Sequence, residues 1–78
     1  MESPRIRLRL FASLLRREPA IPEDYPLSEP KSIRALLLEI GVPEREAAII
    51  FLNGRRSALG DMLADGDEVR IFPLIGGG

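Results

Sequence analysis

The last fourteen residues, 65–78, constrain the fold of this chain more than any other stretch; they read Asp-Gly-Asp-Glu-Val-Arg-Ile-Phe-Pro-Leu-Ile-Gly-Gly-Gly. The Asp-Gly-Asp segment is typical of a turn, because its glycine tolerates positive φ and its carboxylates bond nearby backbone N–H groups. Residues 68–72 alternate polar and apolar side chains, which predicts a strand. Pro73 cannot donate to a strand ladder, so regular pairing is expected to end there.

The glycine-rich tail that follows, residues 74–78, has a composition suited to acyl chemistry. Fully extended, it reaches at most roughly 16 Å, enough to place a carboxylate inside another protein. A carboxylate becomes a good acyl donor only when activated, for example as an acyl-adenylate, and glycine allows the activating enzyme to approach the backbone closely. Glycine is equally typical of a frayed terminus. We predict a folded domain over residues 1–73 and a flexible tail over 74–78.

Composition narrows the class of protein. A chain of 78 residues makes one small domain. The formal net charge of −1, with both signs interspersed, gives no support for a nucleic-acid or anionic-membrane surface. Without an apolar segment long enough to span a bilayer or a signal-peptide pattern, a cytoplasmic location is expected.

Two missing residue types exclude most catalytic sites. The chain has no Cys and no His, which excludes disulfides, thiolate nucleophiles, common zinc sites and imidazole bases. Lys31 is the single lysine, and its charged surroundings do not favour Schiff-base chemistry. Acidic residues around the last turn lack the ligand spacing of a calcium loop, so no metal site is expected. We therefore predict a carrier, subunit or binding module with no bound cofactor, and not a self-contained enzyme.

The first half of the chain predicts a strand, a short helical turn, an edge strand and a helix. Residues 5–11 alternate strictly, with arginines and Phe11 on one face. Residues 12–17 favour a helical turn, and residues 24–27 a short edge strand. Ser32 is a suitable helix N-cap and Gly41 a suitable C-terminal residue. The predicted apolar stripe between them consists of Ile33, Leu36, Leu37 and Ile40, with Leu38 at its edge.

The second half predicts a hairpin before the last strand. Residues 48–52 form the outgoing strand, Asn53-Gly54 the turn, and residues 55–59 the return strand. In the connection over residues 60–64, Met62 and Leu63 are expected to fill the core. This order indicates an α+β roll, a mixed sheet of about four to five strands with one main helix packed on one face.

The residues that carry a family resemblance are Leu-Ala-Asp-Gly-Asp-Glu-Val over 63–69, Ile-Phe-Pro over 71–73, and the terminal Gly77-Gly78. With the hairpin and the helix in the same order, they make nearly the whole chain similar to the ubiquitin-like sulfur-carrier family, which has a β-grasp fold. Phe72-Pro73 before an apolar pair and glycines looks most like the small subunit of molybdopterin synthase. Gly76, and Arg56 after the hairpin turn, depart from that pattern.

The resemblance implies that an E1-like adenylating enzyme uses ATP to activate the Gly78 carboxylate, which then becomes a thiocarboxylate. The tail, comprising Leu74, Ile75, Gly76 and Gly77, would enter the large subunit of molybdopterin synthase and donate sulfur to the molybdenum cofactor precursor. Catalysis would then reside in the partner.

If the fold is ubiquitin-like, the first and last strands are parallel neighbours and the third strand lies beside the last. Side-chain alternation then places all three Phe residues on the uncovered sheet face. Aromatic residues gathered on an open face usually mark an interface. The predicted partner interface comprises Phe11, Ile49, Phe51, Arg70, Phe72 and Pro73.

Two alternatives stay open. One is a thiamine-pathway carrier or a protein modifier that uses the same tail. The other, of a different class, is a ubiquitin-like interaction module whose tail is never activated. A carrier should fail when Gly78 is removed, whereas an interaction module should fail when Phe51 or Phe72 becomes Asp.

Overall fold

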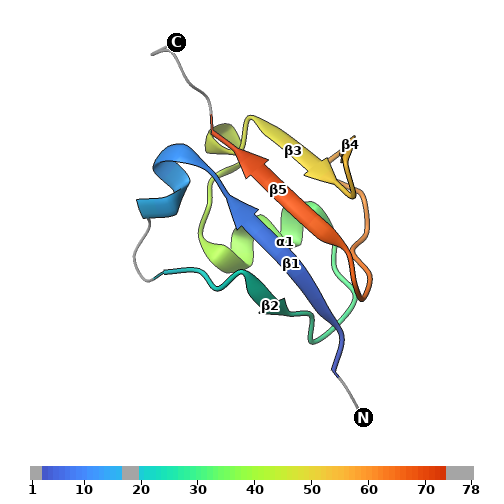
Figure 1. Cartoon of the computed structure of the whole chain (residues 1–78). Coiled ribbons are helices and arrows are strands. Elements are labelled where there is room, and N and C mark those ends of the chain that lie inside the picture. Colours follow the sequence, from blue (N-terminus) through green and yellow to red (C-terminus); the bar gives the residue numbers. More distant parts are fainter. Residues whose placement is uncertain (1–2, 17–19, 74–78) are drawn as a thin grey trace.

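A computed structural model describes residues 3–16 and 20–73 of the chain. It shows an α+β fold with one main helix and a five-stranded mixed sheet of order β2-β1-β5-β3-β4, as the sequence predicted. Helix α1 packs on one face of the sheet (Figure 1). The elements in chain order are β1 (Arg5–Leu10), the 3-10 helix η1 (Ala12–Arg16), β2 (Asp24–Pro26), α1 (Ile33–Ile40), the 3-10 helix η2 (Glu44–Glu46), β3 (Ile49–Leu52), β4 (Arg55–Arg56) and β5 (Glu68–Phe72).

Strands β1 and β5 run parallel at the centre of the sheet (Figure 1). Their register pairs Leu8 with Val69 and Arg9 with Arg70. Strand β3 lies antiparallel on the other side of β5, β2 lies antiparallel on the outer side of β1, and β4 forms the opposite edge. The neighbours predicted for the last strand are therefore confirmed.

The core lies between the sheet and α1. The inward residues of β1 and β5 are buried, as strand alternation requires. From α1, the predicted stripe buries three side chains completely and Ile40 partly. The largest fully buried side chains are Ile6, Ile33, Leu36, Leu37, Val42, Val69 and Ile71. Among the described residues, no helix combines the length and the apolar character needed to cross a membrane.

Helix α1 has the predicted caps at both ends. The Ser32 hydroxyl accepts a hydrogen bond from the Ala35 N–H at 3.1 Å. Gly41 adopts a left-handed conformation, φ 77°, which lets the last turn close. Leu38, expected at the edge of the stripe, is instead 77% exposed. A helix turns about 100° per residue, so the residue after Leu37 points away from the sheet.

The predicted hairpin turn is confirmed, and its Asn53 side chain also forms hydrogen bonds to the start of β5. Asn53 and Gly54 both adopt positive φ, as a two-residue hairpin turn requires. The Asn53 side chain donates to the Asp67 carboxylate and accepts from the Glu68 N–H, both at 2.9 Å. This turn therefore fixes the start of β5 as well as joining β3 to β4.

The return strand is shorter than predicted, because β4 ends at Arg56. The Asp61 carboxylate accepts hydrogen bonds from the Ala58 N–H at 3.0 Å and the Ser57 hydroxyl at 3.2 Å. These bonds close a turn where the sequence predicted extended backbone.

Strand β3 begins one residue later than predicted, at Ile49, because η2 extends the connection before it; Ala48, the first residue of the predicted strand, is exposed. One burial prediction is wrong. Met62 is 58% exposed whereas Leu63 is buried, so only one of the two fills the core. Adjacent residues of an extended segment point in opposite directions, so both could not face inward.

Candidate protein-binding face

The face of the sheet opposite α1 carries the residues predicted to bind a partner. Strand alternation turns Arg9, Arg70, Phe72 and Phe51 outward, since their neighbours along each strand are buried in the core. The register places Phe51 opposite Arg70, and Ile49 opposite Phe72. The uncovered face therefore brings together residues that lie far apart in the sequence.

The three Phe rings form one cluster at the end of this face where β5 ends. Phe11 and Phe72 stack with ring centroids 4.3 Å apart and planes 11° apart. Phe51 meets Phe72 edge to face, with centroids 5.8 Å apart. All three are half-buried, and Ile49 is 38% exposed. We refer to these four residues as the aromatic patch; their role in binding stays a prediction.

Phe11 reaches the patch because the chain stays beside β5 after β1 ends. The Phe11 N–H donates to the Ile71 carbonyl at 3.2 Å, which continues the parallel pairing by one residue. Ala12 then adopts a positive φ of 53° and turns the chain into η1. The residue that broke the polar pattern of the first strand is therefore the one that completes the cluster.

Two other residues assigned to the interface are Arg70 and Pro73. Arg70 lies on the uncovered face, and its Nε is buried 3.2 Å from the Glu68 carboxylate without a hydrogen bond. Pro73 is buried, and its part in the interface stays a prediction. The predicted tail residues Leu74, Ile75, Gly76, Gly77 and Gly78 lie outside the described residues.

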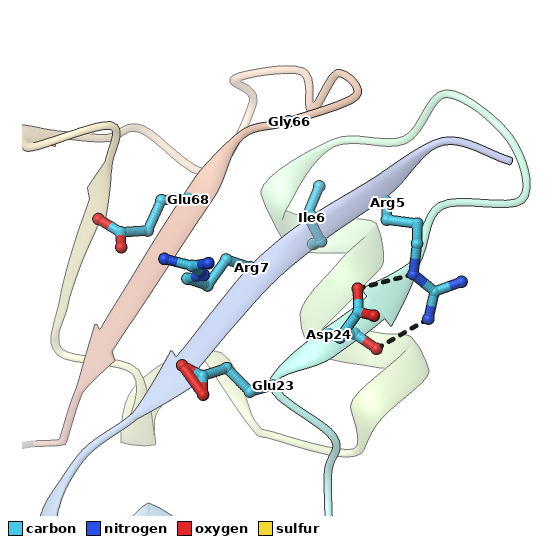
Figure 2. Close-up of a pocket in the computed structure, with 7 residues that line it drawn as sticks. All are labelled: Arg5, Ile6, Arg7, Glu23, Asp24, Gly66 and Glu68. Carbon is cyan, nitrogen blue, oxygen red and sulfur yellow. Dashed lines mark hydrogen bonds and ion pairs between the residues drawn. The ribbon is translucent and has the colours of Figure 1, made fainter. Parts of the chain in front are cut away.

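The other end of the same face holds an open hollow of about 640 Å³ (Figure 2). Arg5 is bound there by Asp24, through Nε to the carboxylate at 2.6 Å and through an NH₂ group to the backbone carbonyl at 3.1 Å. Figure 2 shows Arg7 between the carboxylates of Glu23 and Glu68. Because acids and arginines alternate around it, the hollow favours neither an anion nor a cation.

The carboxylates considered as metal ligands instead accept hydrogen bonds from backbone N–H groups. Asp65 accepts from the Arg5 N–H at 2.9 Å, and Asp67 from the Ala64 N–H at 2.8 Å. The described part of the chain has no group of three or more side chains of the metal-binding types placed to hold an ion.

A polar cluster that sequence reasoning missed lies between α1 and β2. The side chain of Lys31 is only 7% exposed, and its ammonium donates to Glu39. The Tyr25 hydroxyl donates to the other oxygen of the same carboxylate. Hydrogen bonds from Lys31 and then Tyr25 lower the pKa of Glu39, whereas burial, assisted by Glu39, raises the pKa of Tyr25 to about 12. Lys31 and Glu39 lie eight residues apart across a helix start, a separation with no standard sequence signal.

This sheet order, with a parallel central pair, one helix on one face and an aromatic cluster on the other, defines a ubiquitin-like β-grasp protein. A family model described as Mut7-C ubiquitin matches residues 5–76, and the chain belongs to this family. No curated protein and no solved structure matches the chain.

Proposed function

We propose that this protein is a sulfur carrier that acts as the small subunit of molybdopterin synthase. The Gly78 carboxylate would attack the α-phosphorus of ATP on an adenylating enzyme and release pyrophosphate. Hydrosulfide, or an equivalent sulfur donor, would then displace AMP to leave a thiocarboxylate. The chain supplies the acyl group, and the catalytic groups belong to its partners; a sequence without Cys and His supports this division of roles.

One observation carries the proposal: the aromatic patch lies where β5 ends, immediately before the glycine-terminated tail in the sequence. A half-buried aromatic cluster beside an open surface is typical of a binding site for another protein. A partner that covers the patch would lie next to the chain segment that leads to Gly78. Membership of a ubiquitin-like family is compatible with this role.

Intact mass tests the carrier function directly. The protein is incubated with ATP, a purified E1-like adenylating enzyme and a sulfur source. The expected result is a mass increase equal to the replacement of one oxygen by sulfur, located in the C-terminal peptide. A variant extended beyond Gly78 is the matched control and should gain nothing. An unchanged mass across several competent adenylating enzymes would overturn the proposal.

A second candidate, an interaction module without an activated tail, is favoured by the same patch, because the patch alone suffices for binding. Removing Gly78 should abolish sulfur transfer by a carrier. The same removal should leave partner binding by an interaction module intact. Phe72→Asp should abolish binding in both cases. The thiamine-pathway carrier shares the activated tail, so the sulfur acceptor distinguishes it from the molybdopterin role.

A further inference from the structure

Three arginines lie in one cross-strand line on the uncovered face, two residues before Phe72 along β5. Arg9 on β1 pairs with Arg70 on β5, Arg70 with Phe51 on β3, and Phe51 with Arg56 on β4. One line across four strands therefore reads Arg9, Arg70, Phe51, Arg56. We call these three arginines the arginine row.

The arginine row carries one more positive charge than the carboxylates beside it, because Arg9 and Arg70 each lie near one carboxylate and Arg56 lies near none that the structure describes. Arg9 forms an ion pair with Glu23, with 3.6 Å between Arg9 Nε and a Glu23 oxygen, a distance too long for a hydrogen bond. Arg70 Nε makes no hydrogen bond, although a Glu68 oxygen lies 3.2 Å away. Arg56 is exposed and forms no ion pair with any residue that the structure describes. Arg5, by contrast, is bound twice by Asp24.

Like charges placed directly opposite in neighbouring strands destabilise a sheet. Arg9 and Arg70 occupy such a pair at the centre of this one. The protein as a whole is slightly acidic, with a formal net charge of −1, so general basicity does not explain their placement. A pair that costs stability in the free protein is readily explained if carboxylates of a partner lie against it in a complex.

The geometry of the rings favours a protein over a nucleic acid as that partner. Aromatic residues that bind single-stranded nucleic acid need a free ring face on which a base can stack. Phe11 and Phe72 stack on each other, so one face of each ring is already covered. Phe51 is turned edge to face against Phe72. What the cluster offers is a half-buried apolar surface, which suits apolar side chains.

We propose that the uncovered face binds an acidic protein surface, in which carboxylates contact the arginine row and an apolar side chain covers the aromatic patch. This inference rests on the docking role of the patch in the proposed function and names the chemistry of the partner. Binding of an acidic partner requires no activated tail. This inference can therefore fail while sulfur transfer succeeds, and it can hold while sulfur transfer fails.

The test is a titration of the ¹⁵N-labelled full chain, followed by NMR, with three probes. The first is a short peptide rich in Glu and Asp that carries a Leu. The second replaces every acid of that peptide by its amide, and the third is an oligouridylate of matched charge. The acidic peptide should shift the amides of Arg9, Phe51, Arg56 and Arg70, whereas the amide peptide should shift them far less.

Charge reversal supplies the matched variants. Arg56→Glu should weaken binding of the acidic peptide about two- to fivefold, as expected for one exposed ion pair. Arg9→Glu should act in the same direction. Arg34→Glu, on α1, changes the net charge equally and should leave the affinity unchanged, although it also breaks the ion pair of Arg34 with Glu44. Because Arg56 has no partner to lose within the described residues, its variant tests the proposal even if changes at Arg70 affect folding.

Three results would overturn the proposal. The acidic peptide would shift residues elsewhere, the amide peptide would bind equally well, or oligouridylate would bind more tightly at the same ionic strength. The last result would reassign the face to nucleic acid.

Discussion

The contact between Phe11 and Phe72 should be measurable as a coupling free energy, because Phe11 follows β1 and Phe72 ends β5, so the two rings meet only in the folded chain. We consider Phe11→Leu, Phe72→Leu and the double variant. Leucine retains an apolar side chain in each place; Phe72→Leu also removes the edge-to-face contact with Phe51, but this loss is common to the single and double variants and cancels in the coupling. Their coupling therefore reports directly on the geometry of the aromatic patch.

The magnitude follows from the ring geometry. A stacked aromatic pair contributes about 0.5–1.5 kcal/mol beyond its buried area, and the centroids here are 4.3 Å apart with nearly parallel planes. Both rings are half-buried, so each single change should cost about 1–2 kcal/mol in the free energy of unfolding, below the range for a fully buried Phe. The double variant should cost less than the two single changes together, by the coupling of about 0.5–1.5 kcal/mol.

Urea denaturation followed by circular dichroism measures all four free energies of unfolding, with two-state behaviour checked from the slopes. A matched control pairs Phe11→Leu with Leu38→Ala. Leu38 is exposed on α1, on the far side of the sheet, so these two changes should add. A coupling for the Phe pair below about 0.3 kcal/mol, equal to the control, would show that the rings do not stack in solution.

Three further outcomes follow from other parts of the fold. Gly41→Ala should lower the free energy of unfolding by about 1–2 kcal/mol because its φ is +77°, whereas Gly60→Ala, which has open space and no positive φ, should be nearly neutral under the same urea denaturation. Tyr25 carries the single phenolic hydroxyl of the chain, and its ultraviolet titration should have a midpoint at a pKa of about 12. Glu39→Gln should lower this pKa. The stability that depends on the neutral hydroxyl is then fully present below the ordinary pKa of tyrosine, 10.0, and is lost as pH rises through about 12. Lys31 should react slowly with an amine-acylating reagent, because its ammonium is buried against the Glu39 carboxylate. In Glu39→Gln the reaction should be roughly tenfold faster, as measured from the masses of the labelled peptides. Equal rates in the two proteins would contradict this burial.

The sequence predicted the elements whose signals are local. The stripe of α1, its Ser32 and Gly41 caps, and the Asn53-Gly54 turn each depend on residues within one or two turns of each other, and all three are confirmed. The alternation of residues 5–10 and 68–72 predicted which side chains are buried. These features follow from side-chain geometry that does not depend on the rest of the fold.

The errors occur where a distant contact or one side-chain bond decides the backbone. The return strand stops at Arg56 because the Asp61 carboxylate captures Ser57 and Ala58. Met62 points outward because only one of two adjacent residues can face the core. Such bonds carry no periodic signal.

The candidate binding face was only partly predictable for the same reason. Side-chain alternation along each strand placed Phe11, Phe51 and Phe72 on one face once the strand order was assumed. Neither the stack between two of them nor the direct pairing of Arg9 with Arg70 follows from this alternation, because both depend on register. The ion pairs of Arg5 with Asp24 and of Arg9 with Glu23 also depend on how β2 lies beside β1, which no local pattern predicts.

The parallel pairing of β1 and β5 connects the binding face to the tail. Parallel strands end at the same edge of a sheet, so the residue after β1 and the last residue of β5 must meet there. In this chain they are Phe11 and Phe72, and the sequence after Phe72 leads within six residues to Gly78. A partner that binds the aromatic patch and the arginine row therefore contacts the protein beside the end of β5, six residues before Gly78 in the sequence. Binding energy gained on the face is then available to hold the tail in a reactive position, which is how contacts remote from the reacting atoms contribute to catalysis. On this reasoning Phe72→Asp should slow sulfur transfer even though the side chain touches no reacting atom, and a free peptide of residues 74–78 should be a poor substrate for the same adenylating enzyme.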